Sequence, residues 1–195
     1  VVAGVYADDA DARLDLVRDY VSLGAQAVLV SIPFESADKL VADVAEVASA
    51  GPELIMVQDW APSGYGIPID AIERLAREVP AFRSIKIEVA AAGVKYSEVL
   101  GHTGGSLHVA GGWAVTQMTE GLERGVHAFM PTGLHEIYVA IHRRYRAGDT
   151  AWARDLYHKL LPIITFSNQH LDVSIHFFKR LLHRQGIYAT PLVRE

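Results

Sequence analysis

The chain has 195 residues, half of them hydrophobic, which is enough to bury one sizeable core or a core with an appendage. The net charge of −5 gives no electrostatic reason to propose a nucleic acid as a partner, and the absence of cysteine excludes disulfide and thiolate chemistry. No apolar run approaches the length of a membrane span, so we expect no membrane partner and a cytoplasmic location.

Strands and helices are predicted to alternate six times from the start of the chain. Residues 1–6 and 27–32 are continuous apolar runs, as expected of strands covered on both faces. Apolar residues at helical spacing follow such runs, and this alternation predicts a parallel sheet with helices outside it. The predicted strands are residues 1–6, 27–32, 54–57, 83–89, 107–110 and 126–130. The predicted helices between them are residues 10–23, 36–51, 68–78, 95–100 and 113–124.

The last third of the chain changes character. Residues 133–147, 150–164 and 171–184 are three helical segments with no strand between them. We therefore predict a barrel portion over residues 1–133, followed over 134–195 by the last barrel helix and a C-terminal helical extension. Two architectures fit the strands: an open doubly wound sheet, or a (β/α)8 TIM barrel lacking its first two βα units. The absence of a G-x-G-x-x-G turn disfavours a dinucleotide-binding sheet.

Lys86 is the residue around which a site is predicted. It lies between two isoleucines in an apolar strand, where an ammonium group tends to lose its proton or to find a partner. A lysine with a lowered pKa is the usual nucleophile towards ketones. The alternative is a strand-end lysine that pairs with Glu88 or reaches water.

Polar residues and glycines follow the other predicted strands. In either architecture the active site lies at the carboxyl ends of the strands. Glu88 and Asp59 are candidates for proton transfer beside Lys86, and Gln58 for a hydrogen bond to substrate, although capping or satisfied polar roles remain open for them. The residues predicted to line the pocket as well are Asp8, Pro33, Trp60, Gly111, Gly112 and Thr132.

Nine histidines raise the possibility of a metal site. His135 and His142 are seven residues apart on one predicted helix, and His170 and His176 lie in the helical tail. None belongs to an H-E-x-x-H motif or another compact ligand set, so we predict no metal and no cofactor.

The order of these features resembles the dihydrodipicolinate synthase and N-acetylneuraminate lyase superfamily, the class I pyruvate-type aldolases. Lys86 falls at the position of that family's Schiff-base lysine on the sixth barrel strand. The resembling stretches are Val2-Ala3-Gly4-Val5, residues 27–33, Ser84-Ile85-Lys86-Ile87-Glu88, Val109-Ala110-Gly111-Gly112, Arg146-Ala147-Gly148-Asp149 and Leu160-Leu161-Pro162-Ile163.

Two departures from the family pattern are visible. Gln58 stands where the family has a proton-shuttling tyrosine, and glutamine is neither an acid nor a base. The run from Gln58 and Asp59 to Lys86 and Glu88 is similar instead to the branch that contains 2-keto-3-deoxy-arabonate dehydratase. The family's first two βα units, with the hydroxyl residues that hold the substrate carboxylate, are not in this chain, so we expect it to be part of a longer protein or to be completed by another chain.

The resemblance implies a Schiff-base lyase that acts on a small 2-keto acid, by dehydration or by retro-aldol cleavage of a 2-keto-3-deoxy sugar acid. It implies a homo-oligomer, a tetramer or a dimer, and no cofactor. The alternative is a non-catalytic relative that binds a keto acid or sugar acid, and a metal-dependent aldolase on the same fold is a third possibility.

Overall fold

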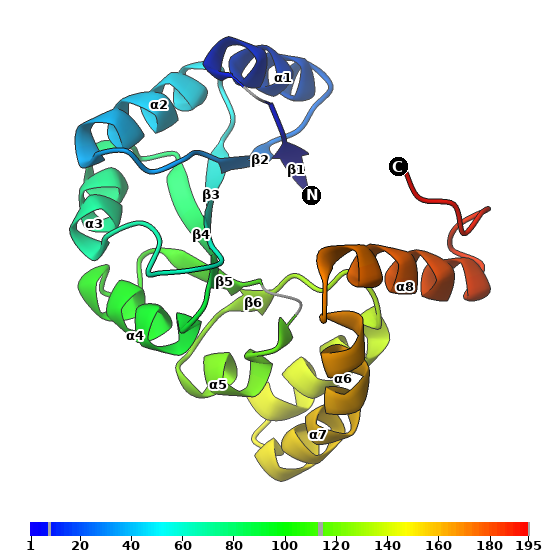
Figure 1. The fold of residues 1–195 in the computed structure, drawn as a ribbon. Helices are drawn as coiled ribbons and strands as arrows, with labels where there is room; N and C mark the ends of the chain where they lie inside the picture. The colour runs from blue at the N-terminus through cyan, green and yellow to red at the C-terminus, as the bar shows by residue number, and fades with distance from the viewer. Residues whose placement is uncertain (8, 113–114, 195) are drawn as a thin grey trace.

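The structure is a computed structural model that describes residues 1–7, 9–112 and 115–194. Six parallel strands form one sheet in the order β1-β2-β3-β4-β5-β6, without a reversal. They curve into an arc, with α1 to α5 along its outer side (Figure 1). The strands are β1 (Val2–Val5), β2 (Ala27–Ser31), β3 (Leu54–Ala61), β4 (Phe82–Val89), β5 (His108–Gly111) and β6 (Ala128–Phe129). The helices are α1 (Ala10–Ser22), α2 (Ala37–Ser49), α3 (Ile69–Glu78), α4 (Ala92–His102), α5 (Met118–Glu123), α6 (His135–Arg146), α7 (Thr150–Ser167) and α8 (Leu171–Arg184).

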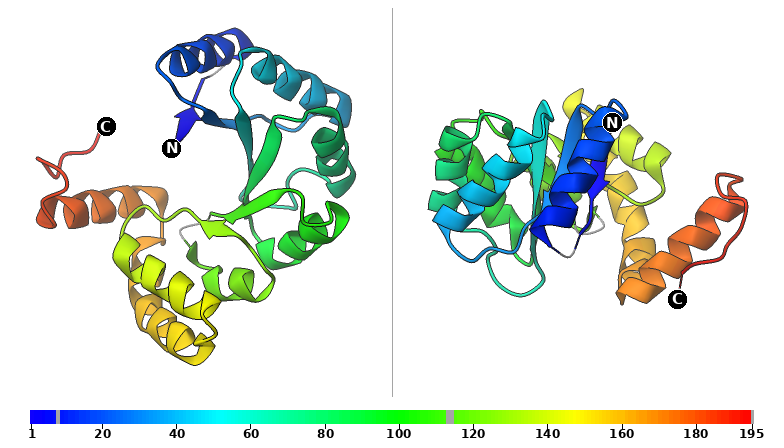
Figure 2. Two further views of the ribbon diagram at one scale, coloured as in Figure 1. Left: turned by 180° about the vertical axis from the view of Figure 1, so that it is seen from behind. Right: turned by 90° about the horizontal axis from the view of Figure 1, so that it is seen from above.

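This arrangement is a part of a barrel rather than a doubly wound sheet. A doubly wound sheet reverses its strand order at a switch point and carries helices on both faces. Here the strand order runs in one direction, and the helices that follow the strands lie outside the arc (Figures 1 and 2). The arc is open between β1 and β6, and α8 lies on that side (Figure 1). The predicted three C-terminal helices are present as α6, α7 and α8.

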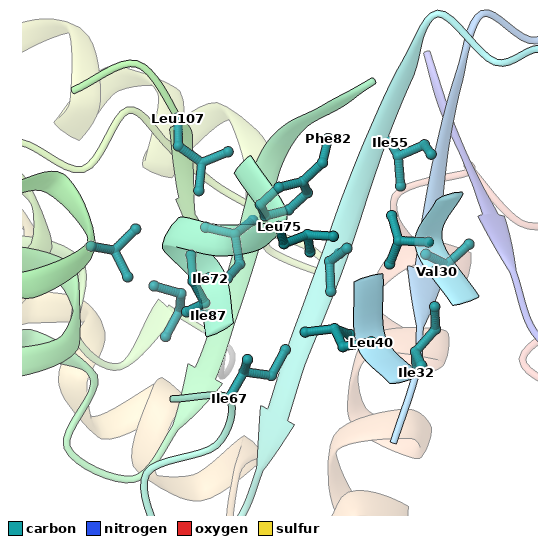
Figure 3. Packing of buried hydrophobic residues seen from close by; sticks show 14 of the residues in the cluster. Val30, Ile32, Leu40, Ile55, Ile67, Ile72, Leu75, Phe82, Ile87 and Leu107 are labelled. Atoms are coloured by element: carbon teal, nitrogen blue, oxygen red, sulfur yellow. The ribbon is translucent and has the colours of Figure 1, made fainter. Parts of the chain in front are cut away.

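The main hydrophobic core lies between the sheet and the outer helices. Val30, Ile55 and Ile87 point from β2, β3 and β4 towards Ile72 and Leu75 of α3 and its neighbours (Figure 3), and all five are buried. Burying such side chains stabilises the fold by roughly 1.5–3 kcal/mol for each residue. Because strand residues alternate between faces, this packing turns the intervening residues to the inner side of the arc.

Several predicted elements have different boundaries in the structure, among them the third strand and the fifth helix. β3 continues to Ala61, so Gln58, Asp59 and Trp60 lie within the strand and not in a loop after it. The predicted helix over 113–124 begins only at Met118, because Val115 has a left-handed backbone conformation, with φ at 64°, that no α-helix contains. Residues 113 and 114 of that prediction lie outside the described residues.

A second hydrophobic cluster holds the C-terminal helices against α5. Val115 and Met118 are buried in it together with Tyr138 of α6 and Tyr157 of α7. The Tyr157 hydroxyl donates to the Val115 carbonyl oxygen at 3.1 Å, and burial raises the pKa of this phenol. These contacts anchor α7, from which the chain turns back towards the sheet to begin α8.

Candidate active site

The candidate site lies on the inner side of the arc, where β3 and β4 run side by side. Their register pairs Gln58 with Lys86 and Trp60 with Glu88. Directly paired residues of neighbouring strands share a face of the sheet, and residues two apart on one strand do so as well. The four side chains therefore project from one face, opposite the face that packs on the helices.

Glu88 joins Lys86 and Gln58 in a small network. Lys86 Nζ lies 2.9 Å from Glu88 Oε2, and the Gln58 side-chain amide donates to the same oxygen. The side chains of Lys86 and Glu88 are only 16% and 10% exposed, so solvent screens their interaction weakly. Pairing with Glu88 was the non-catalytic alternative for Lys86, and the same contact also places a proton acceptor beside the amine.

A cavity of about 280 Å³ opens over this network. Lys86, Glu88 and Trp60 form one side, and Met130 and Thr132, which follow β6, form another. The remaining wall comes from the segment that begins α8. Thr132 and Trp60 thus lie in the same cavity as Lys86.

Pro33 lines a neighbouring cavity of about 470 Å³ at the carboxyl ends of β2 and β3. Gln58 and Trp60 line that cavity too, and Trp60 borders both. Pro33 therefore lies near the predicted site, in a cavity that shares Trp60 with the cavity of Lys86. Asp8, another predicted pocket residue, lies outside the described residues.

The two consecutive glycines have different surroundings. A Cβ atom on Gly112 would overlap the Glu88 side chain, so Gly112 provides the space in which that carboxylate lies. A Cβ atom on Gly111 would meet Phe129 and the Tyr96 hydroxyl on the outer side of the sheet. Gly112 alone of the pair adjoins the candidate site, and the structure turns Gly111 towards the helices.

The prediction that Asp59 lies beside Lys86 is wrong. Asp59 pairs in register with Ile87, on the face that packs on the helices, and it is 1% exposed. Its carboxylate forms an ion pair with Lys95 of α4 and accepts from the Ile67 backbone N–H at 2.9 Å. Burial raises the pKa of Asp59, and Lys95 opposes that shift. One residue of strand alternation separates Asp59 from the site that Gln58 faces.

Lys95 is a buried cation that the sequence prediction did not single out. It is 0% exposed, its ammonium donates to the carbonyl oxygens of Tyr65 and Ile67 at 2.6 and 2.7 Å, and burial lowers its pKa. The sequence does hold a signal, because Lys95 lies three residues after Ala92 and four before Val99, on the apolar stripe of α4. This lysine ties the loop between β3 and α3 to α4, away from the candidate site.

The histidines do not gather into a metal site in the part of the chain that the structure describes. Within those residues there is no group of three or more His, Asp or Glu side chains that could hold a metal ion. His135 and His142 lie together along α6 beside β6, while His170 borders the cavity of Lys86 and His176 a separate groove.

None of the described helices is long and apolar enough to cross a membrane.

The solved structures to which this chain is similar include dihydrodipicolinate synthases. The enzyme from Rhodopseudomonas palustris superposes with a TM-score of 0.86 at 19% identity, over 100% of this chain and 68% of that one. The enzyme from Thermotoga maritima gives 0.83 at 19% identity, over 100% and 70%. The 4-hydroxy-tetrahydrodipicolinate synthase from Methylacidiphilum fumariolicum gives 0.82 at 20% identity, over 100% and 67%.

The chain therefore has the fold of these synthases over about two thirds of their length. The fold that the resemblance implies is confirmed, and both the superfamily and its 2-keto-3-deoxy-arabonate dehydratase branch stay predictions. No protein-family model matches the sequence, and a search of curated proteins gave no match.

Proposed function

We propose that this protein is a lysine Schiff-base lyase for a 2-keto acid, acting as a dehydratase or retro-aldolase of a 2-keto-3-deoxy sugar acid. The observation that carries the proposal is the 2.9 Å contact between Lys86 Nζ and Glu88 in a cavity at the carboxyl end of the sheet. An amine is a nucleophile towards a keto carbon only after it loses its proton, and a carboxylate in contact can accept that proton. The shared fold of the dihydrodipicolinate synthases supports the same chemistry.

In the proposed reaction, Lys86 passes a proton to Glu88 and its amine attacks the keto carbon. The carbinolamine that forms loses its hydroxyl group as water, with a proton returned from Glu88, and an iminium remains on Nζ. The iminium withdraws electrons, so Glu88 can take a proton from C3 and give it to the C4 hydroxyl group, which departs as water. In retro-aldol cleavage Glu88 takes the C4 hydroxyl proton as the C3–C4 bond breaks, and the enamine that remains takes a proton back at C3 to restore the iminium. Water finally hydrolyses the iminium and frees Lys86.

Glu88 is the base that we assign, and Gln58 is a positioning residue. Glutamine is neither an acid nor a base, but its side-chain amide donates to the Glu88 oxygen that Lys86 also contacts. Two donors on one carboxylate oxygen hold the group in a single orientation over the amine. Gln58 would thus replace the family's tyrosine in position while Glu88 takes over the proton transfer.

Borohydride reduction in the presence of pyruvate tests the proposal. We expect a covalent adduct on Lys86 whose mass is that of pyruvate, less one water and plus two hydrogens, because borohydride reduces the iminium to a stable amine. Peptide mapping of the full-length protein locates the adduct, and the peptide that carries the buried Lys95 serves as the internal control. An unmodified Lys86 under saturating pyruvate would contradict the proposed function.

Gly112→Ala is expected to slow trapping by about 10²-fold, because a displacement of about 1 Å in a catalytic group has an effect of that order. The added methyl group would occupy the space of the Glu88 side chain and push the carboxylate off Lys86. Gly101→Ala on α4 is the matched control, since a Cβ atom there has no neighbour within 4 Å. If borohydride traps the adduct in Gly112→Ala at the wild-type rate, Glu88 does not act in the mechanism.

A non-catalytic keto-acid binder is the second candidate, and Gln58 is the observation that favours it. The residue at the tyrosine position has no proton to exchange, and a binding protein needs none. Pyruvate or a 2-keto-3-deoxy sugar acid would then raise the melting temperature without any product being formed. Formation of a product from the sugar acid would decide in favour of the lyase.

A further inference from the structure

The cavity over Lys86 has a wall that comes from far along the chain. Asn168, His170 and Ser174 line it together with Lys86 and Glu88, although the two groups are at least 80 positions apart in sequence. The turn between α7 and α8 carries this wall to the open side of the arc, where α8 begins (Figure 1). His170 is the N-cap residue of α8, and Ser174 lies in the first turn of that helix.

The three side chains offer both donors and acceptors. The Asn168 amide nitrogen donates to the Ile164 carbonyl oxygen at 2.8 Å, which leaves the amide oxygen as the atom to accept from a ligand. His170 Nδ1 accepts from the Asp172 backbone N–H at 3.2 Å, which leaves Nε2 as the ring nitrogen that a ligand can contact. The Ser174 hydroxyl group can both donate and accept.

The charge of the cavity indicates what kind of group this wall would bind. Among the described residues that line the cavity, Lys86 is the one lysine or arginine, and it is already opposite Glu88. A second carboxylate or a phosphate on the ligand would call for an arginine or a lysine, whereas amide, imidazole and hydroxyl groups match alcohol groups. A volume of about 280 Å³ suits a small ligand, at the lower end of ligand pockets.

We infer that Asn168, His170 and Ser174 bind the hydroxylated tail of the substrate and so determine its class. This inference rests on the proposed function, because the tail is defined relative to a keto carbon held at Lys86. The ligand it selects is an uncharged polyol chain attached to a 2-keto acid, in preference to a dicarboxylate or a keto acid without hydroxyl groups. The three residues are specificity-determining and do not touch the reacting atoms.

The test compares two keto acids, pyruvate and 2-keto-3-deoxygluconate, as substrates for borohydride trapping in the full-length protein. Ser174→Ala removes one hydroxyl group from a helix that alanine favours, and His170→Asn removes the imidazole but keeps a side chain that caps helices. We expect each variant to raise the half-saturating concentration of 2-keto-3-deoxygluconate about tenfold, the effect of one lost hydrogen bond. The value for pyruvate should stay within about twofold, since pyruvate has no tail to bind.

His176→Asn is the matched control, because His176 lies on the same helix but borders a different groove. It should leave both concentrations unchanged. Equal changes for the two keto acids in Ser174→Ala and His170→Asn, or no change for either, would overturn the inference.

Thermal shift separates this inference from the proposed function. If neither keto acid labels Lys86, yet 2-keto-3-deoxygluconate raises the melting temperature and Ser174→Ala abolishes that shift, the tail-binding wall stands and the lyase chemistry fails. If pyruvate labels Lys86 but the variants do not distinguish the two keto acids, the lyase stands and the wall is wrong.

Discussion

Lys86→Ala and Lys86→Arg are both expected to lower turnover of a 2-keto acid on the order of 10⁴-fold or more, the scale seen when a catalytic nucleophile is removed. Alanine lacks the amine, and the guanidinium of arginine stays protonated at any pH at which the protein folds. Single-turnover kinetics and borohydride trapping measure the loss. Circular dichroism and the melting temperature show whether the fold persists.

The two substitutions differ in what they do to Glu88. Arginine keeps a cation next to this carboxylate, whereas alanine leaves a group that is 10% exposed without its ion-pair partner. Lys86→Arg therefore isolates the chemistry from the stability of the site. Lys39→Arg is the surface control, since Lys39 pairs with Asp43 on α2. This variant should retain full activity. Turnover within tenfold of wild type in Lys86→Arg would exclude Lys86 as the nucleophile.

The sequence predicted the order of the elements because short runs rich in β-branched residues alternate with helical patterns. Residues 27–32 are apolar apart from Ser31, and residues 83–89 carry buried Ile85, Ile87 and Val89, so both runs were predicted as strands of a covered sheet, and the structure has β2 and β4 there. The region around Val115 was predicted less well. Apolar residues at helical spacing occur there, but tertiary contacts such as the bond from Tyr157 to the Val115 carbonyl oxygen fix a different backbone.

The candidate site was likewise predicted only in part. Lys86 and Glu88 follow from a single strand, whose alternation alone places them on one face. Asp59 was misplaced because β3 was predicted to end at Val57, and in a loop both Gln58 and Asp59 could turn to the same side. The wall that α8 contributes depends on a long-range contact between residues that share no sequence pattern, and local reasoning has no signal for it.

Lys95→Met is expected to destabilise the fold by about 3–5 kcal/mol, although it lies outside the candidate site. Methionine keeps much of the volume but leaves the Asp59 carboxylate, at 1% exposure, without its cation. Two carbonyl oxygens, of Tyr65 and Ile67, lose their donor as well. Urea unfolding measures the change. Lys159→Met is the matched control, because Lys159 and its partner Asp155 are both exposed to solvent. This variant should change stability by less than about 1 kcal/mol.

The double variant Asp59→Asn/Lys95→Met should be more stable than Lys95→Met alone, since asparagine removes the buried charge and retains an acceptor for the Ile67 N–H.

Lowering the pH should also increase the stability of the single variant Lys95→Met. Burial raises the pKa of Asp59 above 3.8, and removing Lys95 removes the group that opposes this shift. The folded form then holds a proton that the unfolded chain releases, so the stability of Lys95→Met rises as the pH falls towards 3.8. A loss in Lys95→Met no larger than in Lys159→Met, and independent of pH, would show that Asp59 relaxes to water and that the pair does not hold the loop in place.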